Sequence, residues 1–243
     1  EGDIVPAVQQ NMTKYAVMVM EPERIRYELE KALYLAREGR PGPSWLDIPL
    51  DVQGTFIETD TLEGYEPAAV PAETDLAETA RQVLARLRQA ERPILYAGNG
   101  IRRAGGMELF RRLCRVLDIP VVTCWDSIDL IATDDAHYCG RGGNMGDRAG
   151  NFAVQNSDFL LCIGARMSIY QVGWNTSTWA RAAYVAMVDI DPLELSKPIL
   201  RVDFPICADA AEFMAVLLAA ADGETFAHAA WLDQCAAWKS AYP

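Results

Sequence analysis

Short apolar runs alternate with amphipathic segments through residues 76–222, and this alternation limits the fold more than any other feature of the chain. The apolar runs are typical of strands at 93–97, 120–124, 159–163, 184–190 and 202–206. The segments between them place apolar residues at helical spacing over 76–87, 107–117, 148–155 and 209–221. Apolar strands that alternate with helices are typical of a parallel sheet covered on both faces. We therefore expect residues 76–222 to form an α/β domain with a doubly wound parallel sheet.

Residues 1–53 carry too few regular elements to form a domain alone. The spacing of apolar residues predicts a helix over 22–39, with Pro22 in its first turn and Gly39 as its stop signal. A short strand over 44–48 follows. Because one helix and one strand cannot bury a core, we expect this segment to dock on another part of the protein.

Two further segments flank the α/β domain. Residues 54–75 hold six acidic residues, two prolines and no clear periodicity, which is typical of a linker. Residues 223–243 contain a weaker helical pattern over 226–242, which we expect to pack back on a neighbouring element. The sequence thus divides into an N-terminal segment, a linker, an α/β domain and a C-terminal helix.

The charge balance argues against nucleic acid as a partner, and the hydropathy argues against a membrane. Asp and Glu total 34 and Lys and Arg total 22, so the formal net charge is −12. Binding to a phosphate backbone needs cationic surface, which an acidic chain lacks. The longest apolar stretch, 213–221, is far shorter than the roughly 18 residues of a membrane span. Nothing N-terminal is typical of a signal peptide, so we expect a cytoplasmic protein.

The cysteines and histidines form no pattern for metal binding or nucleophilic catalysis. Six cysteines are spread through the chain without a CxxC pair, and several lie in apolar runs, as buried structural thiols do. The two histidines, His137 and His228, are too few for a zinc site or a Ser-His-Asp triad. We expect no metal site and no catalytic residue in this chain, and we interpret His137 as an ordinary loop residue.

Glycines and charged residues gather where the predicted strands end. Ligands of open parallel sheets bind outside the carboxyl ends of the strands, so these residues are the candidates for a site. Glycine lets the backbone approach a phosphate, arginine forms paired hydrogen bonds with a pyrophosphate, and a carboxylate accepts from ribose hydroxyls. A glycine-rich loop over 140–147 leads into a helix and adds to this set. The candidate cofactor-binding residues are Gly98, Gly100, Thr123, Gly143, Gly146, Gly164, Arg166, Asp189 and Asp191.

Each of these residues also has a purely structural explanation. Glycines after strands form ordinary turns, and Asp191 followed by Pro192 can cap a helix. Arg166 can be an exposed loop residue that contributes little to stability. The run 98–100 lacks the third glycine of a dinucleotide fingerprint, which disfavours a plain dehydrogenase. The convergence of four strand ends still favours a nucleotide-shaped cleft over unrelated turns.

Five runs stand out together: 42–53 (GPSWLDIPLDVQ), 96–100 (YAGNG), 156–166 (NSDFLLCIGAR), 188–192 (VDIDP) and 238–243 (WKSAYP). In order and at compatible spacing, they resemble thiamine-diphosphate-dependent enzymes of the acetolactate synthase group. The first run resembles the end of that group's pyrimidine-binding domain, and the next three resemble its Rossmann-like central domain. The last run resembles the junction with the diphosphate-binding domain.

The resemblance implies a parent enzyme that joins or decarboxylates 2-keto acids with thiamine diphosphate and Mg²⁺, as a homo-oligomer of two or four subunits. In this family the glutamate that activates the cofactor lies early in the first domain, and the GDG motif that holds magnesium and diphosphate lies in the third. Neither occurs in residues 1–243, and the chain opens at Glu1 without an initiator methionine. We therefore expect the chain to be the middle of a three-domain enzyme and to be inactive alone.

This sequence differs from the family pattern at two places, and the differences affect the predicted acceptor substrate and the predicted flavin. The group carries R-F-D-D-R after the third strand, and its second arginine receives a keto acid carboxylate. Here the run over 166–170 is RMSIY, and the phenol of Tyr170 cannot supply a permanent charge. Asn144 stands where the group has a methionine that packs on substrate. The resemblance thus leaves the acceptor open, and ADP, FAD or no ligand remain alternatives for the cleft.

Two functions of other classes remain open beside the enzyme fragment. One is a stand-alone nucleotide-binding regulatory module, and the other is a structural spacer with an empty cleft. Both lack an enzymatic parent, so extension of the gene beyond both ends of residues 1–243 would favour the enzyme fragment.

Overall fold

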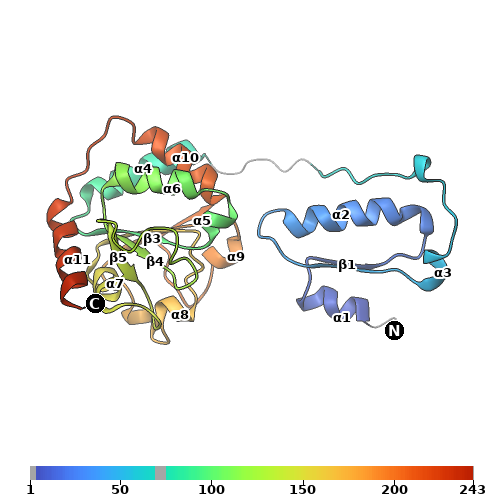
Figure 1. The fold of residues 1–243 in the computed structure, drawn as a ribbon, viewed down its shortest axis with the longest axis horizontal. Coiled ribbons are helices and arrows are strands. Elements are labelled where there is room, and N and C mark those ends of the chain that lie inside the picture. Colours follow the sequence, from blue (N-terminus) through green and yellow to red (C-terminus); the bar gives the residue numbers. More distant parts are fainter. Residues whose placement is uncertain (1–3, 69–74, 243) are drawn as a thin grey trace. The chain divides into compact units, whose positions relative to one another are not determined.

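The computed structural model describes residues 4–68 and 75–242 and divides the chain into two compact units, Glu1–Ala72 and Glu73–Pro243. The division falls inside the segment 54–75, which the sequence predicts to be a linker. Residues 69–74 of that predicted linker lie outside the described residues. Figure 1 shows the helices and strands of each unit.

The first unit is built around two short parallel strands. Its elements, in chain order, are α1 (Ile4–Asn11), β1 (Tyr15–Met18), η1 (Pro22–Arg24), α2 (Ile25–Arg37), β2 (Ser44–Asp47), α3 (Leu50–Gln53) and η2 (Thr59–Thr61). The predicted helix over 22–39 is present as η1 and α2, and the predicted strand is β2. The prediction missed α1 and β1, since β1 is only four residues long and gains its identity by pairing with β2.

Part of the predicted linker packs on α2. The amide of Tyr65 donates to Glu30 over 2.8 Å, and the Tyr65 ring lies 5.4 Å from Tyr27 and 5.7 Å from Tyr34 between centroids. Arg26 donates to the carbonyl of Leu62 over 3.2 Å. Residues 62–65 therefore pack on α2, although the composition of residues 54–75 alone gives no sign of these contacts.

The second unit contains a six-stranded, all-parallel sheet in the order β5-β4-β3-β6-β7-β8. The strands are β3 (Pro93–Ala97), β4 (Val121–Thr123), β5 (Tyr138–Arg141), β6 (Phe159–Ile163), β7 (Tyr184–Asp189) and β8 (Phe204–Cys207). In sequence order this arrangement is 3-2-1-4-5-6, the doubly wound order of Rossmann-like sheets. The predicted α/β fold class is confirmed.

One strand of this sheet was missing from the prediction. Residues 140–147 were predicted to be a loop, but Gly140 and Arg141 complete strand β5 at the edge of the sheet. The run Tyr138–Arg141 is short and contains a glycine with a φ of 120°. Its pairing with β4 also shifts register between Val121 and Val122, so no regular apolar pattern marks this strand in the sequence.

Helices cover both faces of the sheet, and each face has its own core (Figure 1). The helices of this unit are α4 (Leu76–Gln89), α5 (Gly100–Arg103), α6 (Met107–Leu117), α7 (Arg148–Asn156), α8 (Ile169–Val172), η3 (Thr176–Thr178), α9 (Pro192–Leu195), α10 (Ala210–Ala220) and α11 (Ala229–Ala241). Helix α10 packs against α4 and α6 on one face. The aromatic residues of α11 join α7 in the core of the other.

The C-terminal helix is docked as the sequence predicts. Trp231 of α11 is buried and donates from its indole nitrogen to the carbonyl of Pro93 over 3.0 Å. All six cysteines are free thiols, and all except Cys207 are buried. None of the helices within the described residues is long and apolar enough to cross a bilayer.

Candidate functional site

The candidate site lies at the carboxyl edge of the six-stranded sheet, where β3 and β6 are neighbours. The chain leaves β3 toward β4 on one side, and β6 continues toward β7 on the other. A sheet whose strand order reverses in this way opens a crevice at the reversal, and ligands of such sheets bind there. The predicted residues Gly98 and Gly164 follow these two strands directly, and Gly100 begins the short helix α5 after β3.

These three glycines are required because two backbone segments meet. The amide of Gly98 donates to Ile163 over 3.0 Å, and the amide of Gly100 donates to the carbonyl of Gly164 over 2.9 Å. A Cβ atom on Gly98 would lie 2.2 Å from the Gly164 oxygen, and Gly164 itself has a φ of +57°. No larger side chain fits at Gly98 without moving the backbone.

The loop after β5 is closed in a similar way. The amide of Gly143 donates to the side chain of Asn151 over 2.8 Å, and the amide of Gly146 donates to the carbonyl of Gly143 over 3.0 Å. A Cβ atom on Gly143 would lie 2.0 Å from the carbonyl oxygen of Tyr170. The amide of Gly164 likewise donates, to Val188 over 3.0 Å. The predicted glycine amides are thus engaged within the protein, and the structure gives these glycines a packing role.

Arg166 connects the crevice to a buried carboxylate. Its Nε lies 2.8 Å from Oε1 of Glu194, whose side chain is only 6% exposed, whereas the Arg166 side chain is 64% exposed. Lys197 pairs with the other oxygen of Glu194 and donates to the carbonyl of Arg166 over 2.8 Å. The small contribution of Arg166 to stability stays a prediction, and the structure adds a reason for a larger one, because removal of Arg166 would leave a buried carboxylate with one cation fewer.

The two predicted carboxylates organise the turn after β7. Asp189 accepts from the amide of Asp191 over 2.9 Å, and Asp191 caps α9 by accepting from Leu193 over 2.9 Å. The capping explanation of Asp191 is confirmed. Thr123 is fully buried, and its hydroxyl lies 3.4 Å from the Tyr138 hydroxyl, so its side chain does not face the solvent side of the crevice.

One exposed aromatic residue at this edge, Trp125, is absent from the residues that the sequence singles out. Trp125 and Tyr170 are exposed, and their rings lie 6.2 Å apart between centroids. Tyr96 is fully buried, and its hydroxyl has no hydrogen-bond partner among the described residues. Burial raises the pKa of Tyr96 well above its usual value, so the phenol stays neutral. Trp125 stands two positions after the last residue of β4, a place that a search of strand ends for aromatic residues would have found.

An ion pair fixes the loop that follows β5. Arg141 and Asp147 lie 2.8 Å apart between Nη2 and Oδ1, and Nε of Arg141 also donates to Oδ2 over 3.1 Å. The Arg141 guanidinium holds the pKa of Asp147 below its ordinary value. This ion pair therefore joins the two ends of the loop over 141–147.

His137 lies outside the set of residues at the carboxyl edge. Its Nε2 is 2.9 Å from Asp118 and its Nδ1 is 2.9 Å from Asp135. The histidine therefore ties the segment before β5 to the residue that follows α6, which is a structural contact. No group of three or more potential metal-ligating residues is found in the part of the chain that the structure describes.

Comparison with known proteins matches this geometry to one family. The family model described as the thiamine pyrophosphate enzyme central domain matches residues 80–217, which contain all six strands of the sheet. The acetolactate synthase large subunit of Corynebacterium glutamicum is 33% identical over 251 residues, covering 100% of this chain and 39% of the relative. A probable acetolactate synthase large subunit of Methanocaldococcus jannaschii is 33% identical, over 86% of this chain and 36% of the relative.

A third relative is matched over a similar share of its own length. The acetolactate synthase isozyme 2 large subunit of Escherichia coli is 34% identical over 76% of this chain and 33% of its own length. The chain spans between one third and two fifths of the length of these relatives. With its parallel sheet in the Rossmann-like order and these matches, the chain belongs to the thiamine pyrophosphate enzymes, in the acetolactate synthase group, and contains the central domain of that family.

Proposed function

We propose that this chain is the central part of a thiamine-diphosphate-dependent carboligase or decarboxylase that acts on 2-keto acids, as acetolactate synthases do. The observation that carries the proposal is the match of the whole chain to 39% of an acetolactate synthase large subunit. The two units and their order along the chain agree with a proposed assignment of residues 1–53 to the end of a pyrimidine-binding domain and 76–222 to the central domain. Residues 223–243 then lead to a diphosphate-binding domain.

The described residues do not fit thiamine diphosphate and Mg²⁺ as a complete site. Magnesium requires several oxygen ligands, and activation of the thiazolium requires a free carboxylate. The buried glutamates of the two units are both engaged, Glu28 with Tyr15 and Arg24, and Glu194 with Arg166 and Lys197. We therefore assign the cofactor and the metal to parts of the parent protein beyond residues 1–243, and no catalytic step to this chain.

The contribution of this chain is a nucleotide site, which we place at the crevice between β3 and β6. Its support is the reversal of strand order and the exposed guanidinium of Arg166. The engaged glycine amides do not support a phosphate cradle, so the proposal rests on Arg166 for the pyrophosphate. The Ser168 side chain caps α8 and hydrogen-bonds to Gln171. Residues 168–170 carry no charged side chain that could contact a flavin ring. We therefore propose ADP over FAD.

The parent protein is further proposed to be a cytoplasmic homo-oligomer. Apolar side chains on α2 and β2 are exposed in the first unit, namely Leu29, Leu33 and Trp45. Faces of this kind mark surfaces that associate with other protein elements. Six free thiols agree with a reducing compartment.

Turnover is the direct test of this assignment. The 243-residue chain is expected to release no carbon dioxide from pyruvate with thiamine diphosphate and magnesium present, because both buried glutamates of its described residues are engaged with other side chains. The full-length parent, assayed in parallel, is expected to consume pyruvate. Turnover by the 243-residue chain alone would contradict the proposal. An inactive parent that still binds nucleotide would instead support a regulatory module.

The nucleotide proposal is tested by thermal unfolding with ADP. ADP is expected to raise the melting temperature of the native chain by a few degrees, as a ligand of the folded state does at concentrations of about 100 Kd. Arg166→Gln should abolish that shift. Lys197→Gln is the matched control, because it also removes one cation from Glu194 but leaves the exposed guanidinium. Equal loss of the shift in both variants would assign the effect to Glu194 and not to a pyrophosphate contact.

A further inference from the structure

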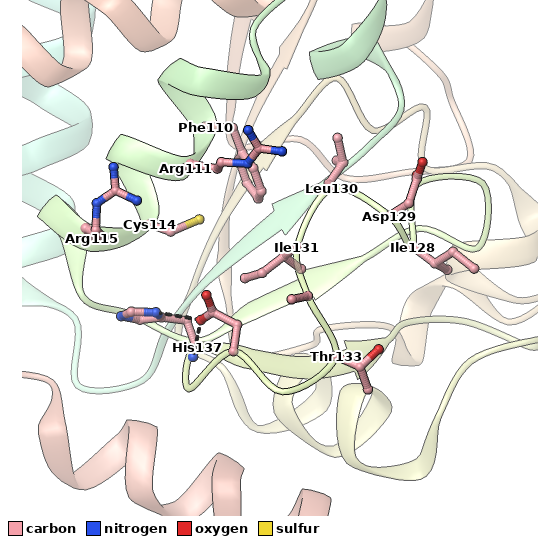
Figure 2. A pocket seen from close by; sticks show the side chains of 12 residues that line it. Phe110, Arg111, Cys114, Arg115, Ile128, Asp129, Leu130, Ile131, Thr133 and His137 are labelled. Atoms are coloured by element: carbon pink, nitrogen blue, oxygen red, sulfur yellow. Dashed lines mark hydrogen bonds and ion pairs between the residues drawn. The ribbon is translucent and has the colours of Figure 1, made fainter.

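A hollow of about 620 Å³ lies between α6 and the segment 128–137, away from the crevice (Figure 2). None of the nine predicted cofactor-binding residues lines it. Pockets that hold small organic ligands have volumes of roughly 300–1,000 Å³ and are mostly apolar with a few polar groups. Half of the residues that line this hollow are apolar and half are polar or charged, which suits a ligand with one apolar and one charged end.

The floor of the hollow is apolar. Phe110 and Leu130 are fully buried beneath it, and Ile131 packs beside them from the opposite segment. Cys114 also lines the floor, and burial raises the pKa of its thiol to about 12, so it is neutral at physiological pH. A hydrocarbon group placed here would leave water for an apolar surface.

The wall opposite α6 is held in place at several points. Ser127 donates to the carbonyl of Ala97 over 2.9 Å, immediately before the wall segment begins. Lys239 donates to the carbonyl of Thr133, and His137 bonds to Asp118 and Asp135 at the end of the segment. A ligand would therefore meet a preformed surface and pay little ordering entropy.

Arginines give the rim a positive charge. Arg111 and Arg115 stand one helical turn apart on α6, which makes them neighbours on one helix face. Within residues 4–68 and 75–242, the side chain of Arg115 forms no ion pair or hydrogen bond. Arg111 pairs with the exposed Glu108.

Both acidic residues of the rim already have side-chain partners, which are an arginine for Asp129 and a histidine for Asp135. Asp129 pairs with Arg102 over 2.6 Å, and Asp135 pairs with His137 over 2.9 Å. Among the described residues, Arg115 is thus the rim cation left for an incoming anion above an apolar floor, in a chain whose net charge is −12.

We propose that this hollow binds a small organic carboxylate whose hydrocarbon group rests on Leu130 and Ile131 and whose charge is met by Arg115 and Arg111. A carboxylate matches a guanidinium geometrically and carries less hydration than a phosphate, which suits a half-apolar site. The site is independent of the nucleotide crevice and of catalysis by the parent enzyme.

Binding is tested on the whole 243-residue chain by amide chemical-shift titration with hexanoate. Hexanoate is expected to bind with a Kd in the millimolar range, roughly that of a weak small-ligand complex, and to move the signals of residues 128–137 and α6. Hexanamide, which has the same hydrocarbon chain without the charge, and acetate, which has the charge without the chain, are each expected to bind at least about fivefold more weakly.

Variants on α6 separate the proposed contact from general electrostatics. Arg115→Gln is expected to weaken hexanoate binding about fivefold or more, and the double variant with Arg111→Gln to abolish it. Arg112→Gln is the matched control, because it removes a charge from the same helix at a position that does not line the hollow. Equal binding of hexanoate and hexanamide, equal loss in the control, or no shifts up to about 20 mM hexanoate would overturn the proposal.

Discussion

The two sheets of this protein are both parallel, yet only one of them has a core. Every residue of β3 and β6 in the six-stranded sheet is buried, whereas β2 of the two-stranded sheet has no fully buried residue. Trp45 of β2 is 42% exposed. Parallel strands are stable when both of their faces are covered, and two strands cannot provide enough covered surface. The number of strands in a sheet and the helices that cover its two faces therefore determine how many strand residues are buried.

Each unit also holds a buried glutamate, with different partners. Glu28 accepts from the Tyr15 hydroxyl and pairs with Arg24 in the first unit. Burial raises the pKa of Tyr15, so this partner is a neutral phenol. Glu194 in the second unit is met by two cations, Arg166 and Lys197. The buried glutamate of the second unit is therefore faced by two cations, whereas the buried glutamate of the first unit is faced by one cation and one neutral phenol.

The largest expected contrast between the units is in limited proteolysis. Digestion should remove the first unit and leave a stable fragment that starts near Asp75, because the boundary between the units lies at Ala72 and Glu73 and few side chains of the first unit are buried. Mass spectrometry of the fragments provides the measurement. First cuts inside 93–206 would contradict this contrast, since they would show that the larger sheet is the weaker region.

A pair of glycine substitutions tests the difference in packing. Gly98→Ala places a Cβ atom 2.2 Å from a backbone oxygen and is expected to destabilise the second unit by about 3 kcal/mol or more. Gly54→Ala in the first unit meets its nearest atom at 3.6 Å with a φ of −87°, so a change within about 0.5 kcal/mol is expected. Urea unfolding, monitored by circular dichroism, gives both values. Similar losses for the two variants would show that the close approach of β3 and β6 is not special.

The smallest expected effect is on acid titration. The Arg141 side chain lowers the pKa of Asp147, and in the first unit the Arg26 side chain and then the Tyr65 amide lower the pKa of Glu30. A carboxyl whose folded pKa is lowered stabilises the fold above its unfolded pKa, and this contribution is lost as pH falls through the folded pKa, below about pH 4.

Carbon-13 NMR titration measures these two carboxyls. Arg141→Gln should raise the Asp147 pKa toward its ordinary value and leave Glu30 unchanged, and Arg26→Gln should do the reverse. An Asp147 pKa that does not respond to Arg141→Gln would assign the lowering to backbone hydrogen bonds.

Sequence patterns predict the elements of this fold where the signal is local. Periodicity located α4, α6, α7 and α10 and the strands β3, β6 and β7 within a few residues, because buried strands and amphipathic helices carry their pattern in consecutive residues. It failed at β5, where a glycine and a register shift interrupt the pattern. It also missed β1, which is defined by its pairing with β2.

The candidate site also combines features that the sequence predicts with features that only the structure shows. The predicted strand ends lie together at one edge of the sheet, since parallel strands bring their carboxyl ends together. The functions of the individual residues there depended on partners distant along the chain, such as Gly98 with Gly164 and Arg166 with Glu194. A glycine that permits backbone contact and one that cradles a phosphate are the same in sequence.

The sequence by itself determined the class of the fold and the family, because apolar strands, helical spacing and short motifs are properties of neighbouring residues. Only the tertiary structure decided which glycine amides are engaged, that a buried glutamate holds Arg166, and that α6 and segment 128–137 enclose a hollow. These features arise where segments far apart in the chain meet, so their geometry and burial exist only after the chain has folded.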